Sequence, residues 1–285
     1  MLPWNLEGSM GSSTRRRFIT RAAAATVIGG FAGYSLWETH DLIIRNQTIV
    51  IPRLPAGFDG LRIAFAGDIH HGPFASLEYV GKMVERLNET RPELILLGGD
   101  YPYYEARYVT PVMEALAGLR APLGVFGVLG NHDNRAGRLL CRQELRRNGI
   151  RDLVNEGEWL DRGGSRLYLG GVDDLWTGQP DLAETLAPLP AGEPALLMSH
   201  NPDFLEQVRD PRVLFAFCAH THGGQVRLPL IGSPIVPSAF GQKYVYGRVR
   251  GPEVSGYVTS GVGTIFPPVR LGCPPEIALL TLQAA

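Results

Sequence analysis

The chain has 285 residues, of which 45% are hydrophobic and 19% are charged, and its formal net charge is −1. This composition is typical of a globular protein, and so small a net charge argues against bulk electrostatic binding of nucleic acid. Three cysteines without Cys-x-x-Cys spacing argue against a disulfide framework.

The first forty residues have the pattern of an export signal. Thr-Arg-Arg-Arg-Phe-Ile at residues 14–19 resembles a twin-arginine motif, and an apolar run of about 16 residues, 22–37, follows it. This run is short for a membrane span, which needs about 20 residues. No clean Ala-x-Ala site directly precedes Glu38. Cleavage of the signal and retention of the segment as an N-terminal anchor therefore both stay open. The alternative interpretation of the basic segment and the apolar run is an ordinary Ala-rich helix with a basic start.

We therefore predict two parts, with residues 1–40 as a twin-arginine signal or N-terminal membrane anchor. Residues 41–285 are predicted to form one domain, large enough for a sizeable core. The expected location is outside the cytoplasmic membrane, in the periplasm or cell envelope, reached through the twin-arginine export machinery.

The first half of the predicted domain alternates between strand-like and helix-like segments. Residues 42–51 indicate an opening hairpin or edge strand, and buried strands are expected at residues 61–66, 94–97 and 125–129. Between them, Ser76 is expected to cap a helix whose apolar face is Val80, Met83, Val84 and Leu87. Further helices are predicted around residues 112–119 and 138–148. This β-α-β-α-β order predicts a central sheet covered by helices.

The second half repeats the strand pattern less regularly. Strand-like runs occupy residues 167–169, 195–198, 213–218, 257–259 and 276–282. Residues 225–256 are rich in proline and glycine and carry several arginines, which favours a hairpin or lid near the site.

Polar motifs follow five of the strand-like runs. Because open α/β sheets place their sites at the carboxyl ends of strands, these motifs are expected to meet. They supply Asp68 and His70, then Asp100, then Asn131, His132 and Asp133, then His200, then His220 and His222.

These side chains suit a metal site. Carboxylate oxygen, amide oxygen and imidazole nitrogen suit Mn, Fe or Zn, and the lack of thiolates argues against a structural zinc site. In extended chain, residues two apart point the same way. We therefore expect Asp68 with His70 to approach one ion together, and His220 with His222 to do the same.

The remaining motif residues have different expected parts. Asp100 lies between the two ligand sets and is expected to bridge two ions about 3.5–4 Å apart, a spacing that clamps a phosphate. Asn131 offers a neutral amide oxygen. His132, its neighbour, must point elsewhere and is expected to protonate a leaving group, with Asp133 orienting its other nitrogen.

The order of these motifs resembles the calcineurin-like metallophosphoesterase superfamily. Gly-Gly-Gln at residues 223–225 and the tail over residues 260–277 are similar to a bacterial branch of exported or membrane-associated phosphoesterases. The resemblance implies an α/β fold, a four-layered α/β/β/α sandwich of two mixed β-sheets flanked by helices. The chain departs from the family's usual pattern at Gly67 and in the aromatic stretch over residues 101–104. This stretch is expected to shape the pocket.

The resemblance also implies roles for the residues and a need for two divalent or mixed-valence metal ions, Mn, Fe, Zn or Mg. One ion would be held by Asp68, His70 and His222. The other would be held by Asn131, His200 and His220. Asp100 would bridge both ions, and a bridging hydroxide would attack phosphorus. His132 would act as the acid or transition-state stabiliser, with Asp133 as its partner.

The predicted function is hydrolysis of a phosphodiester or pyrophosphate bond in a lipid- or nucleotide-linked substrate. Two alternatives stay open: a phosphomonoesterase at the same site, and a catalytically silent metal-binding scaffold. Membrane-surface contact is possible, and no nucleic-acid partner is expected.

Several other polar residues are expected to be structural rather than catalytic. These are Asp173, Asp174, Asp203 and the buried thiol Cys218, while His71 is expected on the pocket wall or the surface.

Overall fold

The computed structural model describes residues 17, 20–21, 29–30 and 33–285. The predicted twin-arginine motif at residues 14–19, except Arg17, and most of the apolar run after it lie outside these residues. Within the described part of the chain, no helix combines the length and apolar character that a membrane span requires.

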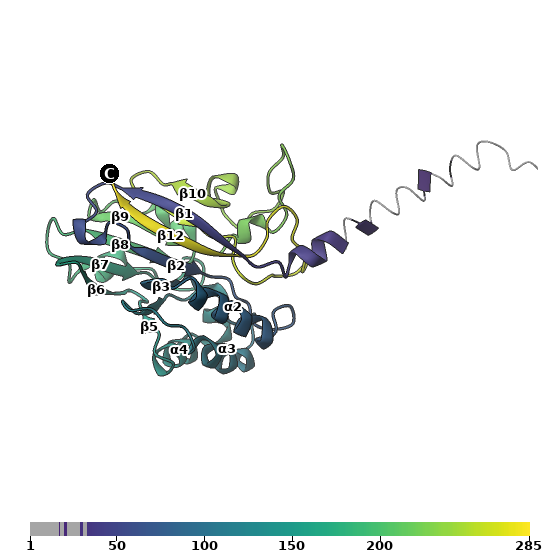
Figure 1. The fold of residues 1–285 in the computed structure, drawn as a ribbon, viewed down its shortest axis with the longest axis horizontal. Helices are drawn as coiled ribbons and strands as arrows, with labels where there is room; N and C mark the ends of the chain where they lie inside the picture. The colour runs from purple at the N-terminus through teal and green to yellow at the C-terminus, as the bar shows by residue number, and fades with distance from the viewer. Residues whose placement is uncertain (1–16, 18–19, 22–28, 31–32) are drawn as a thin grey trace, which may run out of the picture.

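Two mixed six-stranded sheets pack face to face (Figure 1). In spatial order the first sheet contains β1 (Ile43–Ile51), β12 (Glu276–Ala284), β2 (Arg62–Ala66), β3 (Leu94–Leu97), β4 (Val125–Gly127) and β5 (Arg151–Asp152). The second contains β10 (Gly247–Arg250), β11 (Ser255–Val258), β9 (Val213–Cys218), β8 (Ala195–Ser199), β7 (Ser165–Gly171) and β6 (Glu156–Arg162). In each sheet the strands that carry the motifs are parallel, so their carboxyl ends share one edge.

Helices cover the outer faces of both sheets, which confirms the predicted four layers. The first sheet is covered by α2 (Leu77–Glu89), α3 (Val109–Leu116) and α4 (Asn131–Arg147). The second has a thinner cover, made mainly of α5 (Leu182–Leu186) and the 3-10 helix η3 (Pro202–Glu206). The other 3-10 helices are η1 (Ala56–Phe58), η2 (Ala106–Tyr108), η4 (His222–Gly224) and η5 (Gly241–Tyr244).

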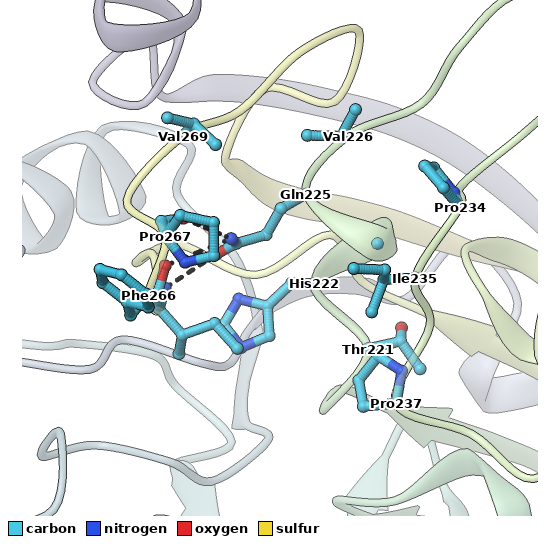
Figure 2. Close-up of a pocket in the computed structure, with 12 residues that line it drawn as sticks. Thr221, His222, Gln225, Val226, Pro234, Ile235, Pro237, Phe266, Pro267 and Val269 are labelled. Carbon is cyan, nitrogen blue, oxygen red and sulfur yellow. Dashed lines mark hydrogen bonds between the residues drawn. The ribbon is translucent and has the colours of Figure 1, made fainter.

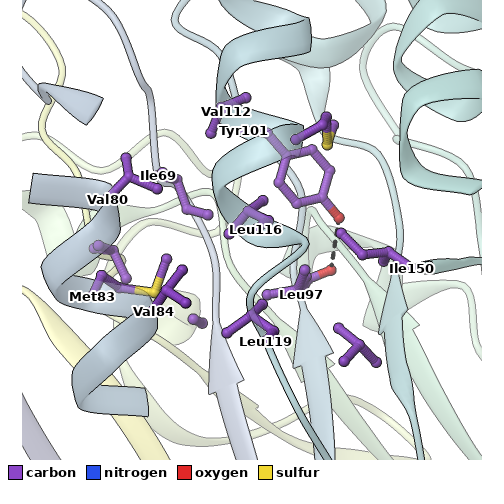
Figure 3. Close-up of a cluster of buried hydrophobic side chains, with 14 of the residues drawn as sticks. Ile69, Val80, Met83, Val84, Leu97, Tyr101, Val112, Leu116, Leu119 and Ile150 are labelled. Carbon is purple, nitrogen blue, oxygen red and sulfur yellow. Dashed lines mark hydrogen bonds between the residues drawn. The ribbon is translucent and has the colours of Figure 1, made fainter. Parts of the chain in front are cut away.

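The central strands are apolar throughout because both of their faces are buried. In β2, Ile63 and Phe65 point between the sheets, where Phe65 meets Phe217 of β9 edge to face. Ala64 points to the other face, toward the core under the helices. There the expected apolar stripe of α2 packs against β3 and α3 (Figure 3), and Ser76 caps the helix by accepting the Tyr79 N–H, as predicted.

Of the two forms expected for the opening segment, a hairpin or an edge strand, the structure has the edge strand: β1 lies at the edge of its sheet and pairs in parallel with β12. One local prediction was wrong in its starting residue. The third helix begins at Asn131 rather than near residue 138, because the Asp133 carboxylate accepts the Gly130 N–H and caps the earlier turn. Gly137, at φ 141°, interrupts the helix where the sequence predicted its start.

Residues just before the predicted domain boundary at residue 40 pack against the domain. Glu38 is buried, and its carboxylate accepts the N–H groups of Gly272 and Cys273, each at 2.9 Å. Ser35 and Thr39 are also buried. The last turn of the N-terminal segment is therefore fixed to the loop before β12.

Candidate metal centre

The loops after β2, β3, β4, β8 and β9 converge at one edge of the two sheets. Their backbones are bonded to one another: the Asp68 N–H donates to Gly99 O, and the His70 N–H donates to Asp100 O. All nine predicted site residues lie here, and all are buried: Asp68, His70, Asp100, Asn131, His132, Asp133, His200, His220 and His222.

Five of these residues have a left-handed backbone. Their φ angles are 50° at Asp68, 49° at His70, 57° at Asp100, 73° at His220 and 53° at His222. This region is uncommon for residues other than glycine, and such strained positions cluster at functional sites. The extended chain assumed in the sequence argument is therefore absent at both pairs.

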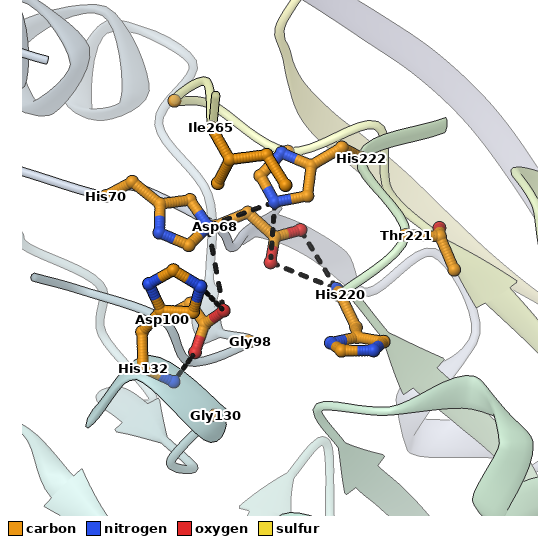
Figure 4. A network of polar contacts seen from close by, with 12 residues as sticks. Asp68, His70, Gly98, Asp100, Gly130, His132, His220, Thr221, His222 and Ile265 are labelled. Atoms are coloured by element: carbon orange, nitrogen blue, oxygen red, sulfur yellow. Dashed lines mark hydrogen bonds and ion pairs between the residues drawn. The ribbon is translucent and has the colours of Figure 1, made fainter. Parts of the chain in front are cut away.

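The first donor group contains Asp68, His70 and His222 (Figure 4). The Nε2 atoms of His70 and His222 are 3.0 Å apart, and His222 Nε2 lies 3.8 Å from Asp68 Oδ1. Both Asp68 oxygens also accept the His220 N–H at 3.0 Å. Residues 152 positions apart in the chain thus present two nitrogens and a carboxylate to one point.

The second donor group contains Asp100, His200 and His220. His200 Nε2 lies 3.3 Å from Asp100 Oδ2 and 3.1 Å from His220 Nδ1, while its Nδ1 contacts Gly98 O at 2.7 Å. His220 and His222 therefore belong to different groups, and the prediction that they approach one ion together was wrong. The left-handed turn between them separates their side chains.

Asp100 stands between the two groups. Its Oδ2 atom is 3.3 Å from His200 Nε2, 3.6 Å from His70 Nε2 and 4.0 Å from His132 Nε2. Its Oδ1 accepts the His132 N–H at 2.8 Å. One carboxylate oxygen thus faces imidazoles of both groups, which is the position a bridging ligand needs.

The residues present fit two cations. Asn131 Oδ1 is buried without a hydrogen-bond partner. An unpaired buried polar atom costs free energy, whereas an oxygen or imidazole nitrogen bound to a cation does not carry that cost. The imidazole pairs at 3.0 and 3.1 Å likewise bring two ring nitrogens together, as two ligands of one cation require.

Electrostatics favour neutral imidazoles at three of the candidate ligands. Burial and the neighbouring imidazoles hold the pKa values of His70, His220 and His222 below their ordinary value. At His200, burial would lower the pKa, but the Asp100 carboxylate beside it raises the pKa to about 10. Burial alone would raise the pKa of Asp100, but the charges of His200 and His132 hold it well below its usual range. Neutral imidazole and ionised carboxylate are the forms that bind metal.

His132 is oriented differently from the prediction. Its Nδ1 contacts the carbonyl oxygen of Tyr103, not Asp133. The Asp133 carboxylate instead accepts three backbone N–H groups, from Gly130 and Asp100 at 2.7 Å and from Tyr101 at 3.0 Å. The prediction that Asp133 orients His132 was therefore wrong, because Asp133 joins the start of α4 to the loop after β3.

Two aromatic side chains that the motifs did not identify flank the centre. Tyr104 stacks on His132, with ring centroids 3.6 Å apart and an interplanar angle of 20°. Trp176 meets His220 edge-on, with centroids 4.2 Å apart. The aromatic stretch over residues 101–104 was expected to shape the pocket, and Tyr104 does so. No sequence signal singled out Trp176.

A buried arginine also supports the site. The Arg270 guanidinium donates to the carbonyls of Ser260 at 2.8 Å, Gly263 at 2.6 Å and Cys273 at 2.9 Å. The Gly263 N–H in turn donates to Asp68 O at 2.7 Å. Arg270 therefore fixes the loop that packs against the backbone of the first donor group.

The residues expected to be structural have structural partners. Asp174 accepts the N–H groups of Trp176 and Thr177, and Asp203 accepts the Ala239 N–H. His71 Nδ1 contacts Ala75 O, and Cys218 is a buried strand thiol, as predicted.

Comparisons with known proteins found a matching family and several similar proteins. The family described as calcineurin-like phosphoesterase matches residues 61–224. The metallophosphoesterase YkuE of Bacillus subtilis (strain 168) is 31% identical over 96% of this chain and 99% of its own. The phosphodiesterase YaeI of Escherichia coli (strain K12) is 33% identical over 94% of this chain and 99% of its own. The solved NAD nucleotidase of Haemophilus influenzae covers 72% of this chain and 46% of its own at 15% identity, with a TM-score of 0.49.

Proposed function

The chain belongs to the calcineurin-like phosphoesterase family and is a metal-dependent phosphoesterase, and from this premise we propose that it hydrolyses phosphodiesters or pyrophosphates at a dinuclear centre. The observation that carries the proposal is the position of Asp100 Oδ2, which faces imidazoles of both donor groups. A site for one ion needs no such shared carboxylate.

We assign the ligands by donor group. Asp68, His70 and His222 would hold one ion, Asn131, His200 and His220 would hold the other, and Asp100 lies where it would serve both. When bound, two such ions polarise the phosphoryl oxygens and supply a nucleophile at neutral pH.

His132 supplies the proton chemistry in this proposal. Its Nδ1 is held by Tyr103 O, and its Nε2 faces the centre, 4.0 Å from Asp100 Oδ2. The Tyr103 carbonyl can only accept, so Nδ1 carries a proton, and it is the doubly protonated imidazole that would give its Nε2 proton to the oxygen that leaves phosphorus. Tyr104, stacked on the imidazole, acts as a positioning residue that limits rotation of the ring.

Phosphodiester rather than phosphomonoester substrates are supported by the relative YaeI, which is named a phosphodiesterase and aligns with nearly the whole chain. The decisive experiment compares bis-p-nitrophenyl phosphate with p-nitrophenyl phosphate on the full-length, manganese-loaded protein. We expect faster cleavage of the diester. Preference for the monoester would replace the proposal with a phosphatase, and two bound metals with no turnover of either ester would favour a silent scaffold.

We further propose that the protein is exported through the cytoplasmic membrane by the twin-arginine machinery and works in the cell envelope on lipid-linked or other amphipathic phosphoesters. The Thr-Arg-Arg-Arg-Phe-Ile sequence at residues 14–19 and the apolar run after it support this location. Replacing Arg15 and Arg16 with lysine should keep the protein in the cytoplasmic fraction. Unchanged export of that variant would contradict the proposal.

A further inference from the structure

An apolar groove shares the candidate metal ligand His222 with the metal centre (Figure 2). It has a volume of about 280 Å³, and Thr221 lines it beside His222. Its walls include Ile235, Ile265 and Phe266. Pockets that enclose whole small molecules measure roughly 300–1,000 Å³, so this groove suits part of a larger apolar molecule.

The groove has a preformed wall on one side. The buried side chain of Gln225 donates to the carbonyls of Ile265 at 3.3 Å and Pro267 at 3.1 Å, and it accepts the Ile265 N–H at 2.8 Å. The segment that carries Phe266 is thus tied to the loop that carries His222. A ligand that enters the groove meets an ordered surface next to the reacting centre.

The rim of the groove exposes large apolar side chains to solvent. Ile235 is 78% exposed and Phe266 is 73% exposed, although both line the groove. At the tip of the neighbouring hairpin, Leu230 is fully exposed and Ile231 is 69% exposed. Single exposed apolar residues are common, but a cluster beside an apolar groove marks an interaction surface.

The N-terminal segment joins the body beside this groove. Glu38 binds the N–H groups of Gly272 and Cys273, and the neighbouring Leu271 pairs with residues 225–227 through its N–H and carbonyl groups. In Figure 1 the helix over residues 33–38 and the hairpin around residue 230 lie at the same end of the molecule. The described residues 33–38 therefore join the domain at the groove end of the molecule.

We propose that this groove holds the lipid tail of a membrane-borne phosphoester while the phosphate lies at the metal centre. The inference rests on the proposed phosphodiesterase function and names its substrate class. The exposed rim then faces the bilayer to which the N-terminal run directs the protein, and the tail reaches the groove without crossing water.

The test uses two phosphodiesters that release the same p-nitrophenolate. One is soluble bis-p-nitrophenyl phosphate; the other is phosphatidyl-p-nitrophenol in phosphatidylcholine nanodiscs that hold the full-length protein. Ile235→Asp is the groove variant and is expected to fold, since the side chain is largely exposed. Leu139→Asp is the matched control, because Leu139 is 71% exposed on α4 and lies outside the groove.

We expect Ile235→Asp to lower about tenfold the ratio of lipid-diester turnover to soluble-diester turnover. The reason is that an acyl chain that meets a charged side chain in the groove loses the favourable burial of its apolar surface. Leu139→Asp should leave that ratio unchanged. An equal ratio in the two variants would overturn the inference. So would a dimer of the native protein that Ile235→Asp dissociates, since a second copy would then cover the rim.

A second readout does not depend on turnover. A lipid phosphodiester with a photoactivatable acyl chain is crosslinked to the protein in the nanodiscs, and the labelled peptides are mapped. Labelling of residues 234–237 and 265–269 is expected. Labelling confined to residues 1–37 would overturn the groove inference even if bis-p-nitrophenyl phosphate is cleaved. Groove labelling without cleavage of either diester would instead overturn the proposed function alone.

Discussion

The Nε2 atoms of His70 and His222 lie 3.0 Å apart with their rings 20° from parallel, although 152 residues separate them in the chain. Burial and adjacent imidazoles lower the pKa of both side chains, so protonation is a poor way to stabilise this contact. A shared cation is a better one. The contact therefore explains why bound metal should stabilise the fold as well as enable chemistry.

Asp100→Asn should remove metal and activity together. The variant loses the carboxylate charge that faces both donor groups, so we expect bound metal to fall from two ions per chain to one or fewer. Activity should fall more than roughly 100-fold, since even partners of metal ligands typically contribute 10–100-fold. Elemental analysis and diester hydrolysis measure the two effects.

The matched control for this variant is Asp152→Asn. Asp152 is also buried, but it pairs with Arg142 at 2.5 Å and Arg146 at 2.9 Å, away from the centre. It should keep both metals while losing thermal stability. Retention of two metals in Asp100→Asn would remove Asp100 from the bridging position.

His132→Ala should separate catalysis from metal binding. We expect turnover to fall about 10²–10⁴-fold while two ions stay bound, because the side chain contacts no ion in the assigned ligand set. The loss should be greater for an alkyl leaving group, which needs protonation, than for p-nitrophenolate. A loss of metal that parallels the loss of turnover would contradict the proton-donor role.

Asp133→Asn should act on stability rather than on proton transfer. The carboxylate accepts three backbone N–H groups, and an amide has one acceptor oxygen and a competing donor. Each buried donor left unpaired costs about 1–3 kcal/mol, so denaturant unfolding should show a loss of at least that size. The contrary outcome is an Asp133→Asn variant of unchanged stability that shows the same leaving-group dependence as His132→Ala. That outcome would support the sequence-based prediction that Asp133 orients His132.

Glu38→Gln should destabilise the full-length protein by about 1–3 kcal/mol, because an amide replaces a buried carboxylate that accepts two backbone N–H groups. Glu78→Gln is the control, since Glu78 pairs with Lys82 on the exposed face of α2 and should not shift the unfolding midpoint. Equal midpoints for both variants would show that the N-terminal turn does not stabilise the domain.

The three cysteines should be unreactive in the folded protein. Burial raises the pKa values of Cys141, Cys218 and Cys273 above the ordinary value of about 8.5, so the thiolate fraction at pH 8 is small. A thiol reagent at pH 8 should therefore label no cysteine before denaturation and three afterwards. Rapid labelling of the native protein would show that one thiol is accessible.

Much of the fold could be read from the chain because both faces of its central strands are buried. Apolar runs such as residues 94–97 and the helical spacing of Val80, Met83, Val84 and Leu87 gave the right elements. The helix start at Asn131 was missed because its cap is the Asp133 carboxylate, which looked like a catalytic group in the sequence.

The sequence by itself determined which residues gather, because a motif at the carboxyl end of a parallel strand must lie at the shared sheet edge. How they divide did not follow from their spacing: the family resemblance placed His220 and His222 at different ions, and only the tertiary structure gives the physical reason. Left-handed backbone at His220 and His222 sends the two side chains to different donor groups, which no two-residue spacing predicts. Contacts such as Tyr104 on His132 and Glu38 on the loop at residues 272–273 join segments whose approach depends on packing of the whole domain.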